Sequence, residues 1–166
     1  GTFKFLETVL EEVIELFPYK YIHIGGDEAV KKDWEVCVNC RKRMEEEGMT
    51  HKNELQGYLV RHIEKFLRER GKTVIGWDEI VETGLPEEAV VMSWRGTPGG
   101  IKASSEGHDV IMAPNSYVYL DYYQDLIRKE PKAVGHMQSL RHVYKFNPVD
   151  GIEQEFHKHI LGLQGN

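Results

Sequence analysis

The sequence predicts an α/β fold in which about five parallel strands alternate with helices. Short apolar runs recur along the 166 residues, and the segments between them have helical periodicity or room for a helical turn. The chain also lacks the G-x-G-x-x-G and G-x-x-x-x-G-K-[ST] loops that open many nucleotide-binding sheets. We therefore expect part of a (β/α)8 barrel, with the carboxyl ends of its strands on one rim.

Three helices are expected in the first half of the chain. Residues 2–17 place apolar side chains on one stripe, and Pro18 ends the pattern. A polar helix is expected at residues 33–47 and an amphipathic one at residues 50–70. The tyrosine-rich segment 115–124 is expected to form a further short strand or a packed loop. Five strands are expected, at residues 21–24, 73–76, 90–93, 109–113 and 159–164.

Length and composition indicate a single piece of one domain, residues 1–166, and exclude several functions. With 40% hydrophobic residues, the chain can bury the core of one ordinary domain. The net charge of −6 is spread over interspersed acids and bases, which argues against nucleic acid as a partner and suits a neutral ligand. No apolar run is long enough to span a membrane, and no motif calls for a cofactor.

Cys37 and Cys40 are the only cysteines and form a C-x-x-C motif. Structural zinc sites generally need four ligands, and no second motif of this kind is present, although His51 is close in sequence. The motif is not expected to open a helix after a strand, which disfavours a thioredoxin-like redox role. A local disulfide and two plain thiols remain as alternatives.

Residues 21–28 read Tyr-Ile-His-Ile-Gly-Gly-Asp-Glu, an apolar run that breaks at two glycines into adjacent carboxylates. Glycine lets the backbone leave strand geometry, so Asp27 and Glu28 need not point to opposite faces and can reach one pocket. Two neighbouring carboxyls suit a general acid beside an ionised partner. The alternative is that both only cap the next helix.

Other acidic and aromatic residues follow the next two expected strands. Trp77, Asp78 and Glu79 come after the second strand, and Trp94 comes after the third. A tryptophan at a strand end either packs in the core or offers its ring to the apolar face of a sugar. Asp78 and Glu79 form a second acid pair, which chemistry alone does not distinguish from the first.

Taken in order, these motifs resemble those of the β-N-acetylhexosaminidases of glycoside hydrolase family twenty. The matches are His-Ile-Gly-Gly-Asp-Glu, Gly-Trp-Asp-Glu, Ser-Trp-Arg, Tyr-x-Asp-Tyr-Tyr-Gln and the final Leu-Gly-Leu-Gln-Gly-Asn. The resemblance implies a catalytic (β/α)8 barrel with the acid pair at the end of its fourth strand, so that this chain holds strands four to eight. It also implies a glycan or glycoconjugate substrate that loses terminal, non-reducing N-acetylglucosamine or N-acetylgalactosamine.

The resemblance further implies a retaining mechanism in which the substrate's own 2-acetamido oxygen attacks the anomeric carbon and forms an oxazolinium intermediate. Glu28 would serve as general acid and then as general base. Asp27 would orient the acetamido nitrogen and stabilise its developing positive charge. Tyr119 would donate a hydrogen bond to the acetamido oxygen.

The resemblance implies substrate-binding roles for two tryptophans and one further acid. Trp77 and Trp94 would wall the acetamido pocket, and Asp121 would bind sugar hydroxyls. His23 and the acid pair together resemble a set of metal ligands. A hard cation is normally bound by more oxygen ligands than these, so we expect no metal. Residues that support the site from behind would be His23, Asp78 and Glu79.

The chain also departs from the family. This sequence has no match to the first three strands of the family's barrel or to a substrate-binding arginine near the first of them. It also has no match to a tryptophan and a glutamate that follow the family's last strand. We therefore expect a piece of a larger barrel that associates with itself through open sheet edges. The alternative function is a non-catalytic fragment or sugar-binding remnant. The resemblance implies an exported parent protein (periplasmic, cell-surface or extracellular), although no signal-peptide pattern begins at Gly1.

Overall fold

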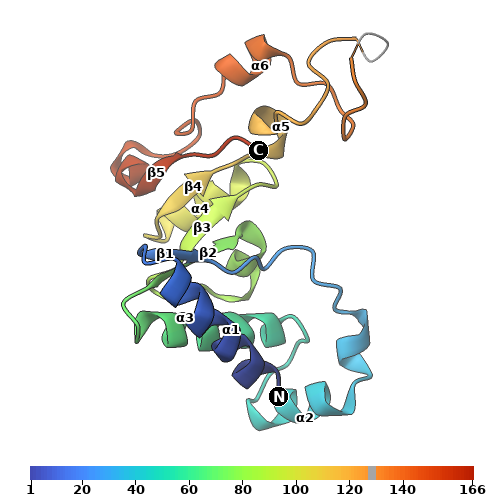
Figure 1. The fold of residues 1–166 in the computed structure, drawn as a ribbon, viewed down its shortest axis with the longest axis vertical. Coiled ribbons are helices and arrows are strands. Elements are labelled where there is room, and N and C mark those ends of the chain that lie inside the picture. Colours follow the sequence, from blue (N-terminus) through green and yellow to red (C-terminus); the bar gives the residue numbers. More distant parts are fainter. Residues whose placement is uncertain (127–129) are drawn as a thin grey trace. The chain divides into compact units, whose positions relative to one another are not determined.

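The structure, a computed structural model, describes residues 1–126 and 130–166 (Figure 1). The chain divides into two compact units, Gly1–Val90 and Val91–Asn166, and each is described by itself. Each of the five expected strands is found within one residue of its predicted bounds, which confirms the α/β prediction. No helix in the described part of the chain is long and apolar enough to cross a membrane.

The first unit begins with the amphipathic helix α1, which ends before Pro18 as predicted. Its elements, in chain order, are α1 (Thr2–Leu16), β1 (Tyr21–His23), the 3-10 helix η1 (Lys32–Glu35), α2 (Val38–Glu46), α3 (Glu54–Arg68), β2 (Thr73–Trp77) and the 3-10 helix η2 (Asp78–Thr83).

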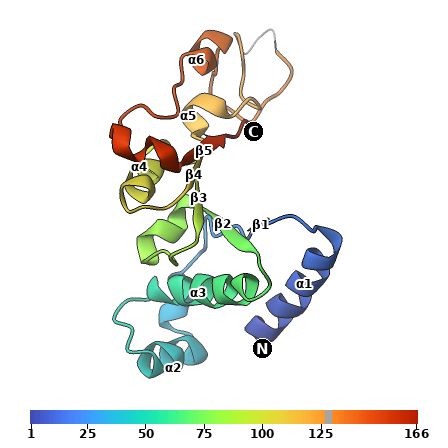
Figure 2. The same cartoon turned by 90° about the vertical axis from the view of Figure 1, so that its left-hand side faces the viewer.

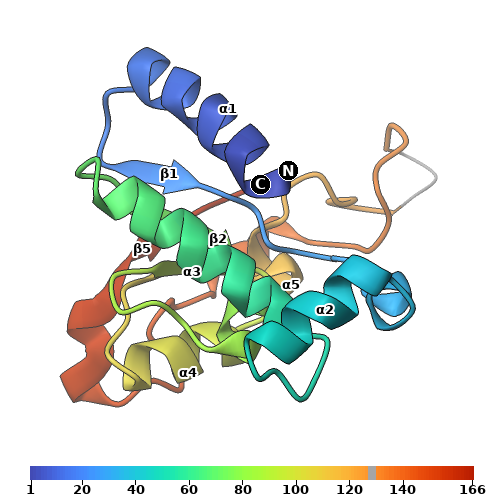
Figure 3. The same ribbon diagram turned by 90° about the horizontal axis from the view of Figure 1, so that it is seen from below.

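The core of the first unit lies between its helices and its strands. β1 and β2 pair in parallel, with Ile22 opposite Val74. Helices α1 and α3 lie on the same face of this pair (Figures 1 and 3). Each fully buried aliphatic side chain contributes about 1.5–3 kcal/mol to folding. The buried cluster consists of Ile22, Ile63, Phe66, Leu67, Val74 and Ala89, and the α1 stripe packs on it.

The second unit contains the remaining parallel strands, with β4 between β3 and β5 (Figure 2). Val110 and Met112 of the central strand are fully buried. The register between β4 and β5 shifts after Val110. The elements are β3 (Val90–Ser93), which begins at the unit boundary, α4 (Pro98–Ser105), β4 (Val110–Met112), α5 (Asn115–Val118), α6 (Leu140–Tyr144), the 3-10 helix η3 (Gln154–His159) and β5 (Ile160–Leu163).

Ser93, at the end of β3, fixes the loop that follows it. Its fully buried hydroxyl accepts a hydrogen bond from the Gly100 amide of α4 at 2.9 Å and donates to the Gly96 carbonyl at 2.9 Å. A Cβ atom on Gly100 would lie 2.5 Å from the Met112 sulfur and 3.1 Å from Val110 Cγ1, so α4 packs closely on β4 at this glycine. The serine of the Ser-Trp-Arg motif thus orders the backbone that follows Trp94.

Two predicted elements differ from the structure. The helix expected at residues 33–47 is divided into η1 and α2, because Cys37 has extended backbone angles between them. Val36 and Val38 flank this break, and β-branched residues favour helices less than most others do. The amphipathic helix begins at Glu54 rather than Thr50, because the Glu54 carboxylate accepts backbone hydrogen bonds from the residues before it.

The tyrosine-rich segment 115–124 is not a strand. It begins with the short helix α5, in which the Pro114 carbonyl accepts from Tyr117 and Val118. The chain then continues irregularly and forms an isolated bridge between Tyr123 and Met137. The expectation of a further strand is wrong, and that of a packed loop holds for the part after α5.

Candidate active site

The acid pair follows a turn at Gly25 and Gly26, whose φ angles of 75° and 99° favour glycine. The Gly25 amide donates to His23 Nδ1 at 3.0 Å, and the Gly25 carbonyl accepts from the Trp77 amide at 2.9 Å. The Gly26 carbonyl accepts from Gln56 Nε2 at 2.6 Å. Hydrogen bonds to β1, β2 and α3 therefore hold the backbone that precedes the carboxylates.

The turn also packs closely on η2. A Cβ atom on Gly26 would lie 2.8 Å from Ile80 Cγ2, and one on Gly76 would lie 2.7 Å from Ile80 Cδ1. Ile80 is fully buried. Gly26 therefore serves both backbone conformation and close packing, Gly25 serves backbone conformation, and Gly76 of β2 serves close packing.

Asp27 and Glu28 are both exposed to solvent, where a substrate can reach them. Glu28 has φ of 48° and is the only non-glycine residue with positive φ in the described ranges 1–126 and 130–166. A left-handed conformation at a non-glycine residue costs about 1–2 kcal/mol. Such strain is concentrated at functional sites, where it serves to aim a side chain.

The second acid pair lies in a different environment. Asp78 is 2% exposed and Glu79 is 8% exposed, and both lie in the first turn of η2. Buried carboxylates at a helix start commonly stabilise the local structure rather than meet a ligand. This contrast in exposure favours the first pair as the chemical one.

His23 lies beside the acid pair, and its ring makes an edge-to-face contact with Trp77, with the ring centroids 4.8 Å apart. Desolvation lowers the pKa of His23, and the charge of Asp27 partly opposes this change. The neutral ring can accept the Gly25 amide hydrogen bond through Nδ1, which a protonated ring cannot. The first unit thus brings His23, Asp27, Trp77 and the glycine turn together.

The second unit brings together two more of the predicted residues. The Trp94 and Tyr119 rings stack with centroids 6.5 Å apart, and Tyr119 also contacts Tyr122 at 5.8 Å. The Asn115 amide donates to the Trp94 carbonyl at 2.8 Å, which ties the end of β3 to the start of α5. Asp121 lies exposed in the loop after Tyr119.

Beside these residues lies a cavity of about 290 Å³ that the sequence did not indicate. Tyr122 and three polar residues that we had not singled out contribute to its wall, namely His136, Gln138 and His142. Gln138 Nε2 donates to the Asn115 carbonyl at 3.3 Å. Isolated histidines and glutamines carry no motif, so sequence reasoning had no signal for them. Similarly, nothing in the sequence distinguished Gln56 from other helix residues.

The described residues contain no group of three or more side chains able to hold a metal ion. The C-x-x-C motif opens a helix, because Cys37 is the N-cap of α2. The element before it is η1 rather than a strand, so the order typical of thioredoxin is still not met. Both cysteines are free thiols.

An accessible acid pair after a parallel strand, with tryptophans at the ends of the next strands, is typical of a barrel glycoside hydrolase. The family model described as "Glycosyl hydrolase family 20, catalytic domain" matches residues 1–166, and the chain belongs to this family. The resemblance drawn from the sequence motifs is thereby confirmed.

Two curated relatives are similar over essentially the whole chain. A beta-hexosaminidase of Porphyromonas gingivalis is 47% identical over 168 residues, which cover 100% of this chain and 22% of that protein. A beta-hexosaminidase of Vibrio furnissii is 37% identical over 168 residues, which cover 99% of this chain and 28% of that protein. The chain therefore spans between 22% and 28% of the length of these relatives.

Solved structures show the same fold. The GH20 exo beta-N-acetylglucosaminidase of Vibrio harveyi in complex with N-acetylglucosamine has a TM-score of 0.86 at 33% identity, covering 99% of this chain and 26% of that one. The beta-N-acetylhexosaminidase of Bacteroides fragilis has a TM-score of 0.78 at 28% identity, covering 99% and 34%. These similarities confirm the prediction of a partial (β/α)8 barrel.

The glycine turn gives a stability prediction. Gly26→Ala combines a φ of 99° with a Cβ atom 2.8 Å from Ile80, so strain and overpacking should together cost about 2–5 kcal/mol in the free energy of unfolding. Gly48→Ala is the matched control, since its φ is 64° and nothing lies within 4 Å of the new Cβ. It should cost only about 1–2 kcal/mol. Urea unfolding measures both, and equal losses would contradict the packing argument.

The C-x-x-C motif gives a reactivity prediction. Hydrogen bonds from the Cys40 amide and thiol lower the pKa of Cys37, and the same thiol bond together with burial raises the pKa of Cys40. Since the thiolate is the nucleophile, iodoacetamide should modify Cys37 at lower pH than Cys40. Peptide mass spectrometry against pH measures this. Cys40→Ala should move the Cys37 profile to higher pH, and an unmoved profile would refute the thiol–thiol contact.

Proposed function

We propose that this chain carries the acid/base centre of an enzyme that removes terminal, non-reducing N-acetylhexosamine, with retention of configuration, by a substrate-assisted mechanism. The observation that carries the proposal is the accessible Asp27–Glu28 pair on a hydrogen-bonded glycine turn, in a chain that belongs to glycoside hydrolase family 20. The complex of the Vibrio harveyi relative with N-acetylglucosamine supports this substrate class.

In this mechanism the acetamido oxygen of the substrate attacks the anomeric carbon while Glu28 protonates the departing glycosidic oxygen. The bond to the leaving group breaks, and an oxazolinium ion forms. Glu28, now ionised, takes a proton from the water that opens this ion and returns to its acid form. Asp27 accepts a hydrogen bond from the acetamido N–H and stabilises the positive charge that develops there.

The other predicted residues bind the sugar. Tyr119 donates its hydroxyl hydrogen to the acetamido oxygen, and the rings of Trp77 and Trp94 cover the apolar faces of the acetamido group. Asp121 accepts hydrogen bonds from sugar hydroxyls. His23 acts through the turn rather than on the substrate, because its Nδ1 accepts from Gly25. The mechanism uses neither a metal nor a cofactor.

Replacement of the proposed acid tests this function. In the full-length protein, Glu28→Gln should lower turnover of a chitobiose-type substrate by about 10²–10⁴-fold, because protonation of a poor leaving group is lost. The first step on a 4-nitrophenyl N-acetylglucosaminide should suffer less. Kinetics on both substrates check this, and near-normal turnover of the chitobiose-type substrate would defeat the assignment of Glu28.

A second variant at the same position separates chemistry from folding. Glu28→Gly should unfold at an equal or higher urea concentration than the wild type, because glycine adopts φ of 48° without strain. Its activity should still fall at least as far as that of Glu28→Gln.

A sugar covalently trapped on any carboxylate of this chain would instead indicate an enzyme nucleophile and overturn the substrate-assisted mechanism.

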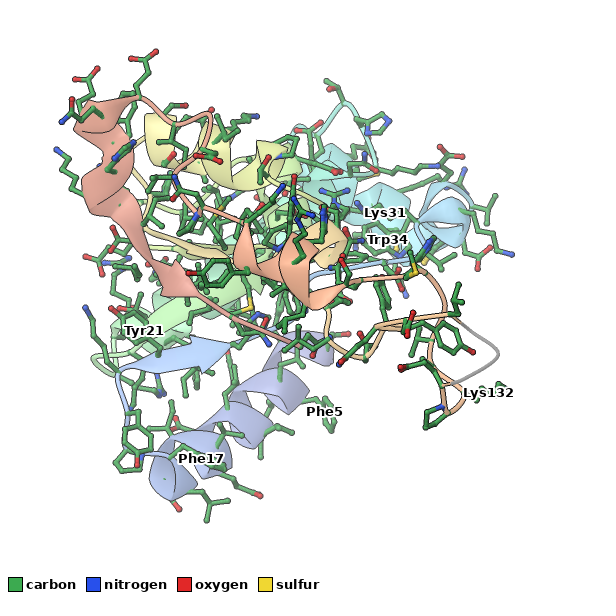
Figure 4. All side chains as sticks on the ribbon, turned by 90° about the horizontal axis from the view of Figure 1, so that it is seen from above. Phe5, Phe17, Tyr21, Lys31, Trp34 and Lys132 are labelled. Atoms are coloured by element: carbon green, nitrogen blue, oxygen red, sulfur yellow. The ribbon has the colours of Figure 1, made fainter. Side chains whose placement is uncertain are left out.

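The proposal of self-association rests on open sheet edges and on apolar side chains that the first unit leaves exposed. Phe5 is 68% exposed and Phe17 is 55% exposed, and Figure 4 shows both extending from the α1 region. Tyr21 at the start of β1 is also exposed. We expect light scattering of the 166-residue chain to show dimers or larger species. A monomer with the turnover of the full-length protein would refute both self-association and the alternative of an inactive fragment.

A further inference from the structure

Gln56 is a buried polar residue that connects α3 to the backbone of the acid pair. It is 4% exposed, and its Nε2 donates to the Gly26 carbonyl at 2.6 Å across 30 residues of sequence. Polar side chains are rarely buried to this degree unless they make a specific hydrogen bond. The bond therefore defines the position of one particular peptide group.

That peptide group is the one that leads into the acid pair. The Gly26 carbonyl and the Asp27 amide belong to the same planar unit, so a donor fixed on the oxygen also fixes the orientation of the amide and the direction in which Asp27 leaves the turn. Gly26 itself has no side chain to restrict its rotation. Without an external donor, the peptide has greater freedom to rotate.

The donor is itself held rigidly. A Cβ atom on the neighbouring Gly57 would lie 2.6 Å from the Thr83 carbonyl, so α3 is in close backbone contact with the end of η2 at this point. At the start of the helix, the Glu54 carboxylate accepts from the Thr50 and His51 amides at 2.9 Å and 2.8 Å. Gln56 thus extends from a helix turn that is fixed on both sides.

We propose that Gln56 is a positioning residue for the reaction, which holds the Gly26–Asp27 peptide so that Asp27 and Glu28 face the substrate correctly. It touches neither the substrate nor the reacting atoms. The catalytic part of this inference rests on the proposed function. Its structural part rests on the 2.6 Å hydrogen bond between Gln56 Nε2 and the Gly26 carbonyl.

The other amide atom of Gln56 makes the inference sharply testable. Gln56 Oε1 is buried and has no hydrogen-bond partner in the described ranges 1–126 and 130–166. It lines, with Asp27, a cavity of about 360 Å³ whose remaining wall is mostly apolar. A carboxylate at this position would find no described donor and would be penalised by burial, so its protonated form is favoured. A protonated carboxyl can donate its O–H to the Gly26 carbonyl in place of the amide.

Two variants in the full-length protein test the role in catalysis. Gln56→Met keeps the length of the side chain and removes the donor, and kcat for a chitobiose-type substrate should fall about 10–100-fold with a smaller change in KM. Gln56→Glu should lose activity at high pH and regain it relative to the wild type as the pH falls, because the introduced carboxyl becomes a donor only when protonated. Gln154→Met, on the exposed surface of η3, is the matched control and should match the wild type.

A merely structural role would lower the amount of folded protein without producing this pH-dependent rescue. The proposal is overturned if Gln56→Met keeps kcat within about twofold of the wild type, or if the ratio of Gln56→Glu to wild-type activity is the same at every pH. Failure of the proposed function is recognised separately, by normal turnover of the chitobiose-type substrate in Glu28→Gln.

A measurement independent of activity completes the test. The Gly25 amide bonds to His23 Nδ1 and the Trp77 amide bonds to the Gly25 carbonyl, so both report on the order of the turn. Gln56→Met should accelerate hydrogen exchange at these two amides, while amides in the middle of α3 exchange as in the wild type. Unchanged exchange at Gly25 and Trp77 would overturn the proposal even for a protein without measurable turnover.

Discussion

The hydrogen bonds to the glycine turn are the constraint on which the acid site depends. The Gly25 and Gly26 carbonyls accept from β2 and α3, and the Gly25 amide donates to the last residue of β1. The three elements that form the core of the first unit are therefore also the elements that fix the turn. A change in packing between them is transmitted directly to the backbone of the acid pair.

Glu28 of the acid pair is placed against the preference of its backbone. Glu28 has a left-handed conformation that glycine would adopt more easily, and its side chain remains exposed. Asp78 and Glu79, by contrast, are buried in a helical first turn. Because Glu28 is strained and exposed, it contributes little to the stability of the fold. Its retention is consistent with selection for chemistry.

The second unit uses buried polar contacts for a comparable purpose. The Ser93 hydroxyl bridges the loop after β3 and the start of α4, and the Trp94 carbonyl accepts from Asn115. The aromatic residues that stack beside this loop are therefore attached to a backbone that β3, α4 and α5 hold together. In both units, residues of the predicted motifs lie at or just beyond strand ends whose backbone is held by hydrogen bonds to other elements.

The sequence by itself determined the strands, the family and the acid pair, because these depend on local patterns: apolar runs, glycine pairs and ordered motifs that adjacent residues contain. The break at Cys37, the helix α5 and the Ser93 hydrogen bonds are local features that the sequence patterns did not reveal. Nor did the sequence determine the hydrogen bonds from Gln56 to the Gly26 carbonyl and from Gln138 to the Asn115 carbonyl. Those depend on which carbonyl or amide lies within hydrogen-bond distance of a side chain. Such distances exist only after segments far apart in the sequence have packed, so only the tertiary structure decided them.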